Sequence, residues 1–249
     1  MNWRNMRWWL AGFIAYLIFL LVTFPASYAL VWWQKRMPEV QLANVSGSVW
    51  SGSAQELALY GQSYGALQWK FDWRTFITGN LGLRLWLRSP EMSLKARVSS
   101  SRNNFLLRDV RGHMPISWAD TWLALPADSV SGNIDLELNR MLLVNLRPAL
   151  IDGVVNLTNV TLNWPQSVAL GDYQIKLSSQ DQKGIHGSLL DTSGPLVLQG
   201  TLDITPGGHY QAKGTISSRE PSNSALMNLL DLLPADKAGN HRFNFSGQW

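Results

Sequence analysis

The sequence predicts an all-β domain behind one N-terminal transmembrane helix, with the domain built as a curved antiparallel sheet that carries one or two short helices. Two observations predict this class. Residues 8–34 contain no charged side chain, and later stretches alternate apolar and polar residues at the period of a half-buried strand. Charged residues make up 15% of the 249 residues, against roughly 25% in an ordinary soluble domain. The chain is long enough to bury a core.

The apolar stretch at 8–33 is long enough to cross a bilayer. As a helix it would span roughly 39 Å, whereas a hydrocarbon core needs about 20 residues. A pair of Trp residues stands at each end, where indole rings favour the membrane–water interface. Pro25 is expected to bend the helix, because it lacks an N–H donor and clashes with the preceding turn.

Two interpretations of this stretch remain open at the sequence level. One is an uncleaved membrane anchor, and the other is a cleaved signal peptide, since Ser27-Tyr28-Ala29 places small residues at the spacing that signal peptidase requires. The anchor is favoured because the apolar run is longer than that of a signal peptide and is followed by Lys35 and Arg36. A mature chain that begins at Leu30 would exclude the anchor.

The net charge of +4 lies entirely beside the apolar stretch. Arg4, Arg7, Lys35 and Arg36 flank it, and the rest of the chain carries 17 basic and 17 acidic residues. Nucleic-acid-binding proteins concentrate basic residues on the folded domain, so we expect no nucleic-acid partner. The absence of Cys excludes disulfides, thiolate metal sites and Cys nucleophiles.

Alternating stretches predict strands through the rest of the chain. Leu81–Arg88 alternates Leu with Gly, Arg or Trp, and Leu196–Ile204 keeps one apolar face along its length. The phase slips between Leu157 and Val160, which predicts a β-bulge near Thr158. Shorter alternating runs lie at 134–138, 173–177, 210–216 and 243–249.

Turn and cap signals complete the expected element order. Pro206-Gly207-Gly208 predicts a hairpin turn between two strands. Short helices are expected at Ser117–Leu125 and at Ala225–Leu233, each ending before a Pro, with Ser224 as the cap of the second.

The sequence contains no arrangement typical of an active site. The four His residues stand alone, and no HExxH zinc motif, Walker-type phosphate loop or GxSxG elbow occurs. Asp135 and Glu137 share one strand face, which we interpret as solvent-facing. We therefore expect no enzyme activity, no cofactor and no catalytic or metal-binding residues.

The most basic part of the predicted domain is Lys70–Arg111, with nine basic and three acidic residues. Within it, Arg84, Trp86 and Arg88 are expected to share one face of a strand. A face of this kind binds an acidic partner or lipid headgroups. The alternative is a solvated strand face whose charge is balanced by acids elsewhere in the fold.

The segment after the apolar stretch carries the most specific pattern. Gly47-Ser48-Val49-Trp50-Ser51-Gly52-Ser53-Ala54 precedes Leu67-Gln68-Trp69 and Phe76-Ile77-Thr78-Gly79-Asn80-Leu81. In order and spacing these resemble the G-x-[VL]-W-x-G-x-A, L-x-W and apolar-G-x-L elements of the type II secretion system protein N family (general secretion pathway protein N). We interpret the matching positions as structural: Gly47, Val49, Trp50, Gly52, Ala54, Leu67, Trp69, Gly79 and Leu81.

The resemblance implies a non-enzymatic inner-membrane component of a machine that exports folded proteins from the periplasm across the outer membrane. It implies a cytoplasmic tail at 1–7, one transmembrane helix at 8–33 and a periplasmic β-rich domain at 34–249. The partners it implies are other secretion components, at the inner-membrane platform or the outer-membrane channel, together with inner-membrane lipids. Free strand edges would be a ready route to such protein contacts.

A second function stays open beside this one. The predicted sheet is also similar in style to AsmA-type proteins, whose long periplasmic β-grooves are associated with lipid movement. A likeness of fold does not establish function. An apolar trough that holds lipid would favour the AsmA-type function, and a filled core without lipid would favour a structural one.

Overall fold

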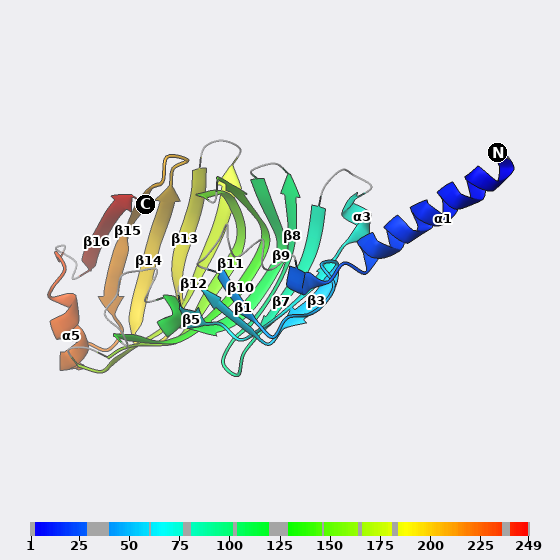
Figure 1. Ribbon diagram of the computed structural model, residues 1–249. Helices are drawn as coiled ribbons and strands as arrows, with labels where there is room; N and C mark the ends of the chain where they lie inside the picture. Colours follow the sequence, from blue (N-terminus) through cyan, green and yellow to red (C-terminus); the bar gives the residue numbers. More distant parts are fainter. Residues whose placement is uncertain are drawn as a thin grey trace.

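The computed structural model describes residues 3–28, 40–59, 61–76, 81–101, 104–119, 129–145, 147–163, 166–180, 184–235 and 240–248. Most of these residues form β-strands, so the prediction of a mainly β fold is confirmed. Most of the strands build one long, curved sheet, with a helix projecting from one end and a short helix packed at the other (Figure 1).

The long sheet contains thirteen strands. They are β2 (Ser46–Gly47), β3 (Ser51–Ala54), β6 (Ala66–Phe71), β7 (Leu81–Arg88), β8 (Ser93–Ser101), β9 (Asn104–Pro115), β10 (Val130–Val144), β11 (Arg147–Leu162), β12 (Val168–Gln180), β13 (Gly184–Ser193), β14 (Leu196–Ile204), β15 (His209–Ser218) and β16 (His241–Gln248). A second sheet of three strands contains β1 (Val40–Ala43), β4 (Glu56–Leu59) and β5 (Gln62–Ser63). The helices are α1 (Trp3–Val22), α3 (Trp73–Phe76), η1 (Ile116–Ala119) and α5 (Ser224–Leu230).

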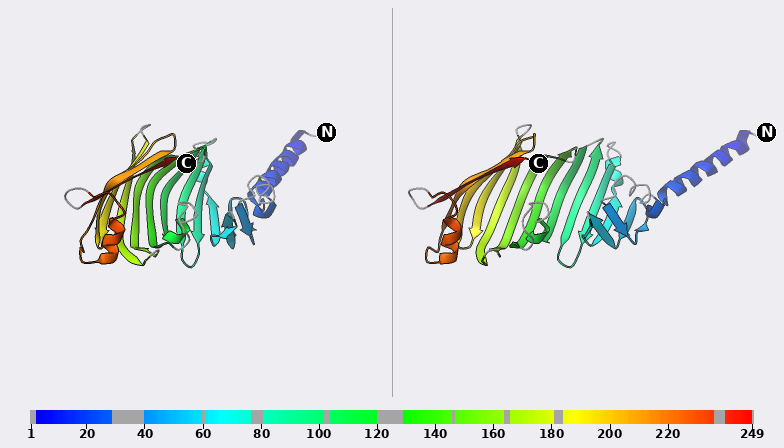
Figure 2. Two further views of the ribbon diagram at one scale, coloured as in Figure 1. Left: turned by 90° about the vertical axis from the view of Figure 1, so that its left-hand side faces the viewer. Right: turned by 60° about the vertical axis from the view of Figure 1, so that its left-hand side comes forward.

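From β6 onward the long sheet is an antiparallel meander, in which each strand pairs with the next strand of that sheet along the chain. Strands β7 and β14 have the bounds that the alternation predicts. The predicted bulge is present, because the register of β11 against β12 shifts between Leu157 and Val160 and Asn159 adopts a positive φ of 54°. The open sheet leaves β2 and β16 as its two edges (Figure 2).

The two short helices differ from their predicted bounds. Within the described residues, the first is only the 3₁₀ turn η1, and residues 120–125 of the expected helix lie outside them. The second, α5, is capped by Asn223 rather than Ser224, since the Asn223 side chain accepts the Leu226 N–H at 3.2 Å. Asn is as good an N-cap as Ser, and the side chain that reaches the third N–H determines the start.

One face of the long sheet is apolar and is covered mainly near its ends. Near β7 the small sheet covers it, and Leu57, Leu87 and Met92 are buried there. Near β14 it is covered by α5, whose Leu226 and Leu230 are almost fully buried against the sheet. Between these covers, many apolar side chains of the face are only half-buried, including the cross-strand row Val98, Leu107, Met141 and Ile151.

The N-terminal helix α1 ends at Val22, before Pro25, whereas the apolar stretch continues to residue 33. Its large apolar side chains are exposed, with Trp9 82% exposed and Phe19 62% exposed. Among the described residues, no helix combines the length and the apolar character needed to cross a membrane. The membrane anchor at 8–33 stays a prediction.

Candidate interaction surfaces

The residues that carry the sequence motif form the junction between α1 and the sheet. Gly47 lies in β2, Gly52 and Ala54 lie in β3, and Val49 and Trp50 lie in the turn between these strands. The Val49 N–H donates to the Phe24 carbonyl oxygen at 3.1 Å, just beyond α1. The motif therefore joins the N-terminal segment to the first strands, which supports its interpretation as structural.

Trp69 in β6 holds this junction from the sheet side. Its indole N–H donates to the carbonyl oxygens of Ser48 and Val49, both at 3.2 Å. Gly52 is required beneath the ring, because a Cβ at this position would overlap the Trp69 indole and lie 2.6 Å from the Ser46 carbonyl oxygen. The other two motif elements include Leu67 in β6 and Leu81 at the start of β7, while Gly79 lies outside the described residues.

Trp50, the Trp of the motif, lies in an aromatic cluster at the same junction. Its ring lies 5.0 Å, between centroids, from both Phe71 and Trp73, edge-on to the first and tilted against the second. Aromatic pairs at this separation and angle are favourable beyond the area they bury. The tryptophans of the motif thus stabilise the start of the sheet.

The structure places Arg84, Trp86 and Arg88 on the same face of β7, opposite the apolar face. A shallow depression of about 400 Å³ lies beside them on this polar face, and its lining includes Trp86, Arg88, Lys95, Arg111 and Glu137. The three predicted residues thus belong to a wider basic region.

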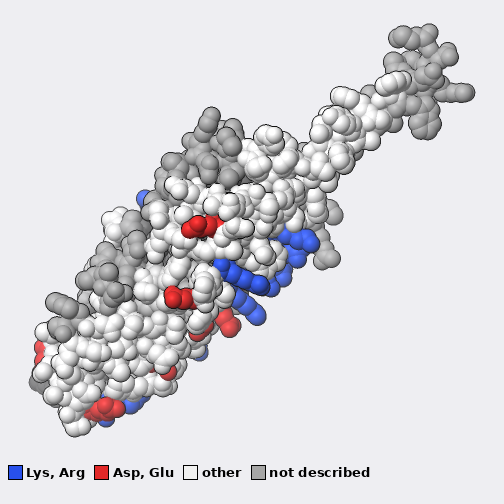
Figure 3. Space-filling model, turned by 60° about the horizontal axis from the view of Figure 1, so that its bottom comes forward, with Lys and Arg blue, Asp and Glu red and all other residues white. Residues whose placement is uncertain are grey.

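The centre of this region is a line of five cations in cross-strand register, which we call the basic row. Each member lies directly opposite the next on the neighbouring strand, from β6 to β10. The row consists of Lys70, Arg84, Arg97, Arg108 and Arg140. Figure 3 shows Lys and Arg atoms gathered on the half of the body nearer α1, with some Asp and Glu atoms beside them.

Two irregularities of the backbone bring the basic row together. Strict alternation would place Arg108 and Arg111 on opposite faces of β9, but Asp109 has a positive φ of 51° and the register against β8 shifts here. The register of β10 against β11 also shifts, between Leu138 and Arg140. Arg140 lies directly opposite Arg108 on β9. Such bulges re-aim side chains along a strand. The sequence shows the basic content of this region, but simple alternation does not predict the row or the place of Arg140 in it.

Three members of the row contact carboxylates of their own chain. Arg140 donates through Nε and Nη2 to Oδ2 of Asp152, at 3.2 and 3.0 Å. Arg97 lies 3.5 Å from the Asp109 carboxylate and Arg84 lies 3.8 Å from that of Asp72. Within the described part of the chain, Lys70 and Arg108 form no ion pair, so the row keeps a positive excess.

The polar face also carries hydrogen-bonded cross-strand pairs. His113 and Asp135 lie 2.7 Å apart, and His186 and Asp203 lie 2.6 Å apart. Over the described ranges no three His, Asp or Glu side chains come together in a way that could hold a metal ion.

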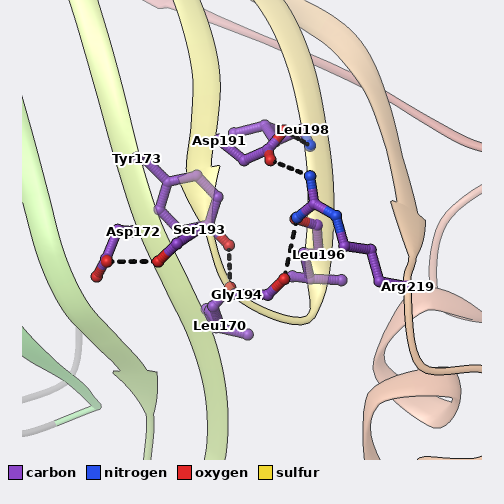
Figure 4. Close-up of polar contacts among 9 residues, drawn as sticks. All are labelled: Leu170, Asp172, Tyr173, Asp191, Ser193, Gly194, Leu196, Leu198 and Arg219. Atoms are coloured by element: carbon purple, nitrogen blue, oxygen red, sulfur yellow. Dashed lines mark hydrogen bonds and ion pairs between the residues drawn. The ribbon is translucent and has the colours of Figure 1, made fainter.

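The apolar face contains a pocket of about 350 Å³ where α5 meets the sheet. Its lining is almost wholly apolar. The one polar group, the Tyr173 hydroxyl, donates to the Leu170 carbonyl oxygen at 2.6 Å (Figure 4). The pocket therefore offers no open polar group to a ligand. It is lined by Leu170, Tyr173, Leu196, Leu198, Ile216, Leu229, Leu230, Leu232 and Leu233.

A half-exposed ion pair lies beside this pocket (Figure 4). Arg219 donates to Asp191 at 2.5 Å and to the carbonyl oxygens of Gly194 and Leu196 (Figure 4). Burial acts to raise the pKa of Asp191, but the hydrogen bonds from Arg219 and from the Leu198 N–H outweigh it and the pKa is lowered. Burial, followed by the charge of Asp191, raises the pKa of Tyr173 to about 12. At neutral pH Asp191 is therefore ionised and the Tyr173 hydroxyl is protonated, so both groups can keep these hydrogen bonds.

Comparison with known proteins assigns the chain to a family. Residues 38–244 match the profile of the family described as type II secretion system (T2SS), protein N. The chain belongs to the T2SS protein N family. This confirms the resemblance that the Gly47–Ala54 motif indicates. The role of the family is that of a secretion component, and both the basic row and the apolar pocket are interpreted with that role in mind.

Two relatives of the protein N family extend over most of the chain. A type II secretion system protein N of Klebsiella pneumoniae is 24% identical, covering 94% of this chain and 92% of the relative. One of Aeromonas hydrophila is 26% identical and covers 82% of each chain. No solved structure matches this sequence.

Proposed function

We propose that this protein N family member is a non-enzymatic component of the type II secretion system that supports export of folded periplasmic proteins through protein–protein contacts. In this proposal residues 8–33 anchor the chain in the inner membrane, residues 1–7 lie in the cytoplasm and residues 34–249 lie in the periplasm. Family membership over residues 38–244 supports the secretion role. The exposed apolar side chains of α1 support the anchor.

The observation that carries the contact role is the basic row on an open sheet. Five aligned cations with two members unpaired in the described residues form a surface for an acidic partner. The edge strand β16 offers a second route, since backbone N–H and C=O groups of an edge can pair with another strand. Either route would link the protein to the inner-membrane platform or the outer-membrane channel.

Deletion of the gene tests the secretion role. We expect a cargo enzyme of the system to accumulate in the periplasm of the deletion strain and to return to the medium when the full chain is supplied. The fraction of cargo activity in the medium, against a cytoplasmic marker, is the measurement. Normal export without the chain in every growth condition tested would contradict the proposal.

We infer a second candidate function, the binding of lipid, from the apolar face. The half-buried row Val98, Leu107, Met141 and Ile151 and the pocket beneath α5 form apolar surface that the described elements do not fill. Ligand pockets of a few hundred Å³ with apolar walls are typical of small-molecule sites. An acyl chain fits a wall without open polar groups.

Mass spectrometry of the purified full chain tests the lipid function. Leu198→Trp places a large ring in the pocket, and Gln199→Trp places the same ring on the polar face as a control. We expect lipid to copurify with wild type and with Gln199→Trp, and to be reduced with Leu198→Trp. Lipid levels that are the same in all three, or absent from wild type, would exclude this function.

A further inference from the structure

We propose that the basic row is the docking site for an extended acidic segment of a partner protein. The inference rests on the proposed function for the kind of partner, a secretion component, and adds the partner's chemistry and the residues that meet it. Lys70, Arg84, Arg97, Arg108 and Arg140 are the contact residues.

The arrangement of the row favours the binding of an anion. Like charges that lie directly opposite each other on neighbouring strands destabilise a sheet, and here Arg84, Arg97, Arg108 and Arg140 follow one another without an interruption. Nearby carboxylates compensate only part of this repulsion. A bound polyanion relieves the rest, so the row is more favourable in a complex than alone.

Carboxylate is the anion that the row already binds. Arg140 contacts Asp152 through two N–H groups, and Arg97 contacts Asp109. Four of the five members are Arg, whose planar guanidinium suits carboxylates and keeps its charge. Arg97 and Arg108 are exposed, and Arg97 retains 61% of its side-chain surface. Additional carboxylates can therefore reach the row.

The shape of the row favours a linear ligand over a membrane surface. From β7 to β11 the next row on one side of it carries no charge. On the other side Lys95 and Arg111 stand opposite each other, and Glu137 stands opposite Arg111. Five strands spaced about 4.8 Å apart give a line of about 19 Å, which roughly six extended residues cover. A bilayer would press the neighbouring carboxylates against anionic headgroups. The uncharged row is Gly82, Ser99, Leu106, Leu142 and Leu150.

Binding of a fluorescein-labelled oligoglutamate peptide to the full chain in detergent tests this inference. Fluorescence anisotropy compares wild type with Arg97→Glu/Arg108→Glu. The control is Lys176→Glu/Lys213→Glu, which changes the net charge equally on exposed positions of the same face but outside the row. We expect the row variant to bind at least about tenfold more weakly and the control to bind as wild type. Higher salt should weaken wild-type binding.

Three outcomes would overturn the proposal: no peptide binding by wild type, equal losses in the row variant and the control, or row-dependent binding to phosphatidylglycerol vesicles without peptide binding. The last would assign the row to lipid headgroups instead. Arg97→Gln/Arg108→Gln removes the cations without adding repulsion and replaces the Glu variant if the latter fails to fold. The assay contains no secretion component, so its failure would leave the proposed export role intact, and an export failure would leave the peptide result intact.

Discussion

At the scale of single residues, Gly52 and Trp69 fix the start of the sheet. The Trp69 indole lies over Gly52 and donates to the turn at Ser48 and Val49, so the contact joins β3, β6 and the segment after α1. These contacts support the interpretation of the motif as structural. Glycine is required at position 52 because no larger residue fits beneath the Trp69 ring.

Gly52→Ala should destabilise the protein by about 1–3 kcal/mol, since the added methyl group overpacks the site and moves the indole or the Ser46 backbone. Urea unfolding of the full chain in detergent, followed by Trp fluorescence, measures the change. Gly207→Ala is the control, because a Cβ there meets nothing closer than 3.8 Å. Equal stability of Gly52→Ala and wild type would contradict this packing role.

Asp191 makes a pH-dependent contribution at the same scale. Its pKa is lowered in the folded chain below the unfolded value of about 3.9. Its contribution is therefore fully present above that value and is lost as the pH falls through the folded pKa. The free energy of unfolding between about pH 2 and 6 should fall less steeply for Asp191→Asn than for wild type. The same slope in both chains would exclude Asp191 as a source of acid sensitivity.

At the scale of elements, the basic row is a product of strand register. Arg108 lies between Arg97 on β8 and Arg140 on β10, so removing its charge should relieve repulsion. Arg108→Gln is expected to raise the free energy of unfolding by about 0.2–1 kcal/mol at low salt. The gain should shrink as salt rises.

Lys213→Gln provides the matched control for that measurement. Lys213 lies opposite Thr201 and Asn244, neither of which is charged, so its stability should change little. A loss of stability in Arg108→Gln would show that Arg108 stabilises the free protein, and it would contradict a net repulsion between Arg108 and the neighbouring Arg97 and Arg140.

The sequence predicts individual strands better than it predicts their alignment. The bounds of β7 and β14 follow from local alternation, as does the bulge near Asn159. The basic row does not, because it depends on the positive φ of Asp109 and on a register shift before Arg140. The start of α5 also differs, since both Asn223 and Ser224 are good caps and geometry selects one.

At the scale of the whole molecule, the long sheet has an apolar face and, opposite it, a more polar face. The apolar face is covered near its ends by the small sheet and by α5, while the polar face carries the basic row on the half that follows α1 (Figures 1 and 3). The alternation of apolar and polar residues predicts the mainly β class, and the motif predicts the family. The packing of the small sheet and of α5 on the apolar face could not be predicted, because it depends on contacts between segments that are distant in sequence.

Photo-cross-linking in intact cells tests our proposal that this secretion component acts through contacts made by the basic row. A photoreactive residue at Arg108 is compared with the same residue at Lys213. We expect that position 108 gives products with another type II secretion component, joined at an acidic segment, and that position 213 does not. Identical products from both positions, or no protein product from position 108 while export continues, would contradict it.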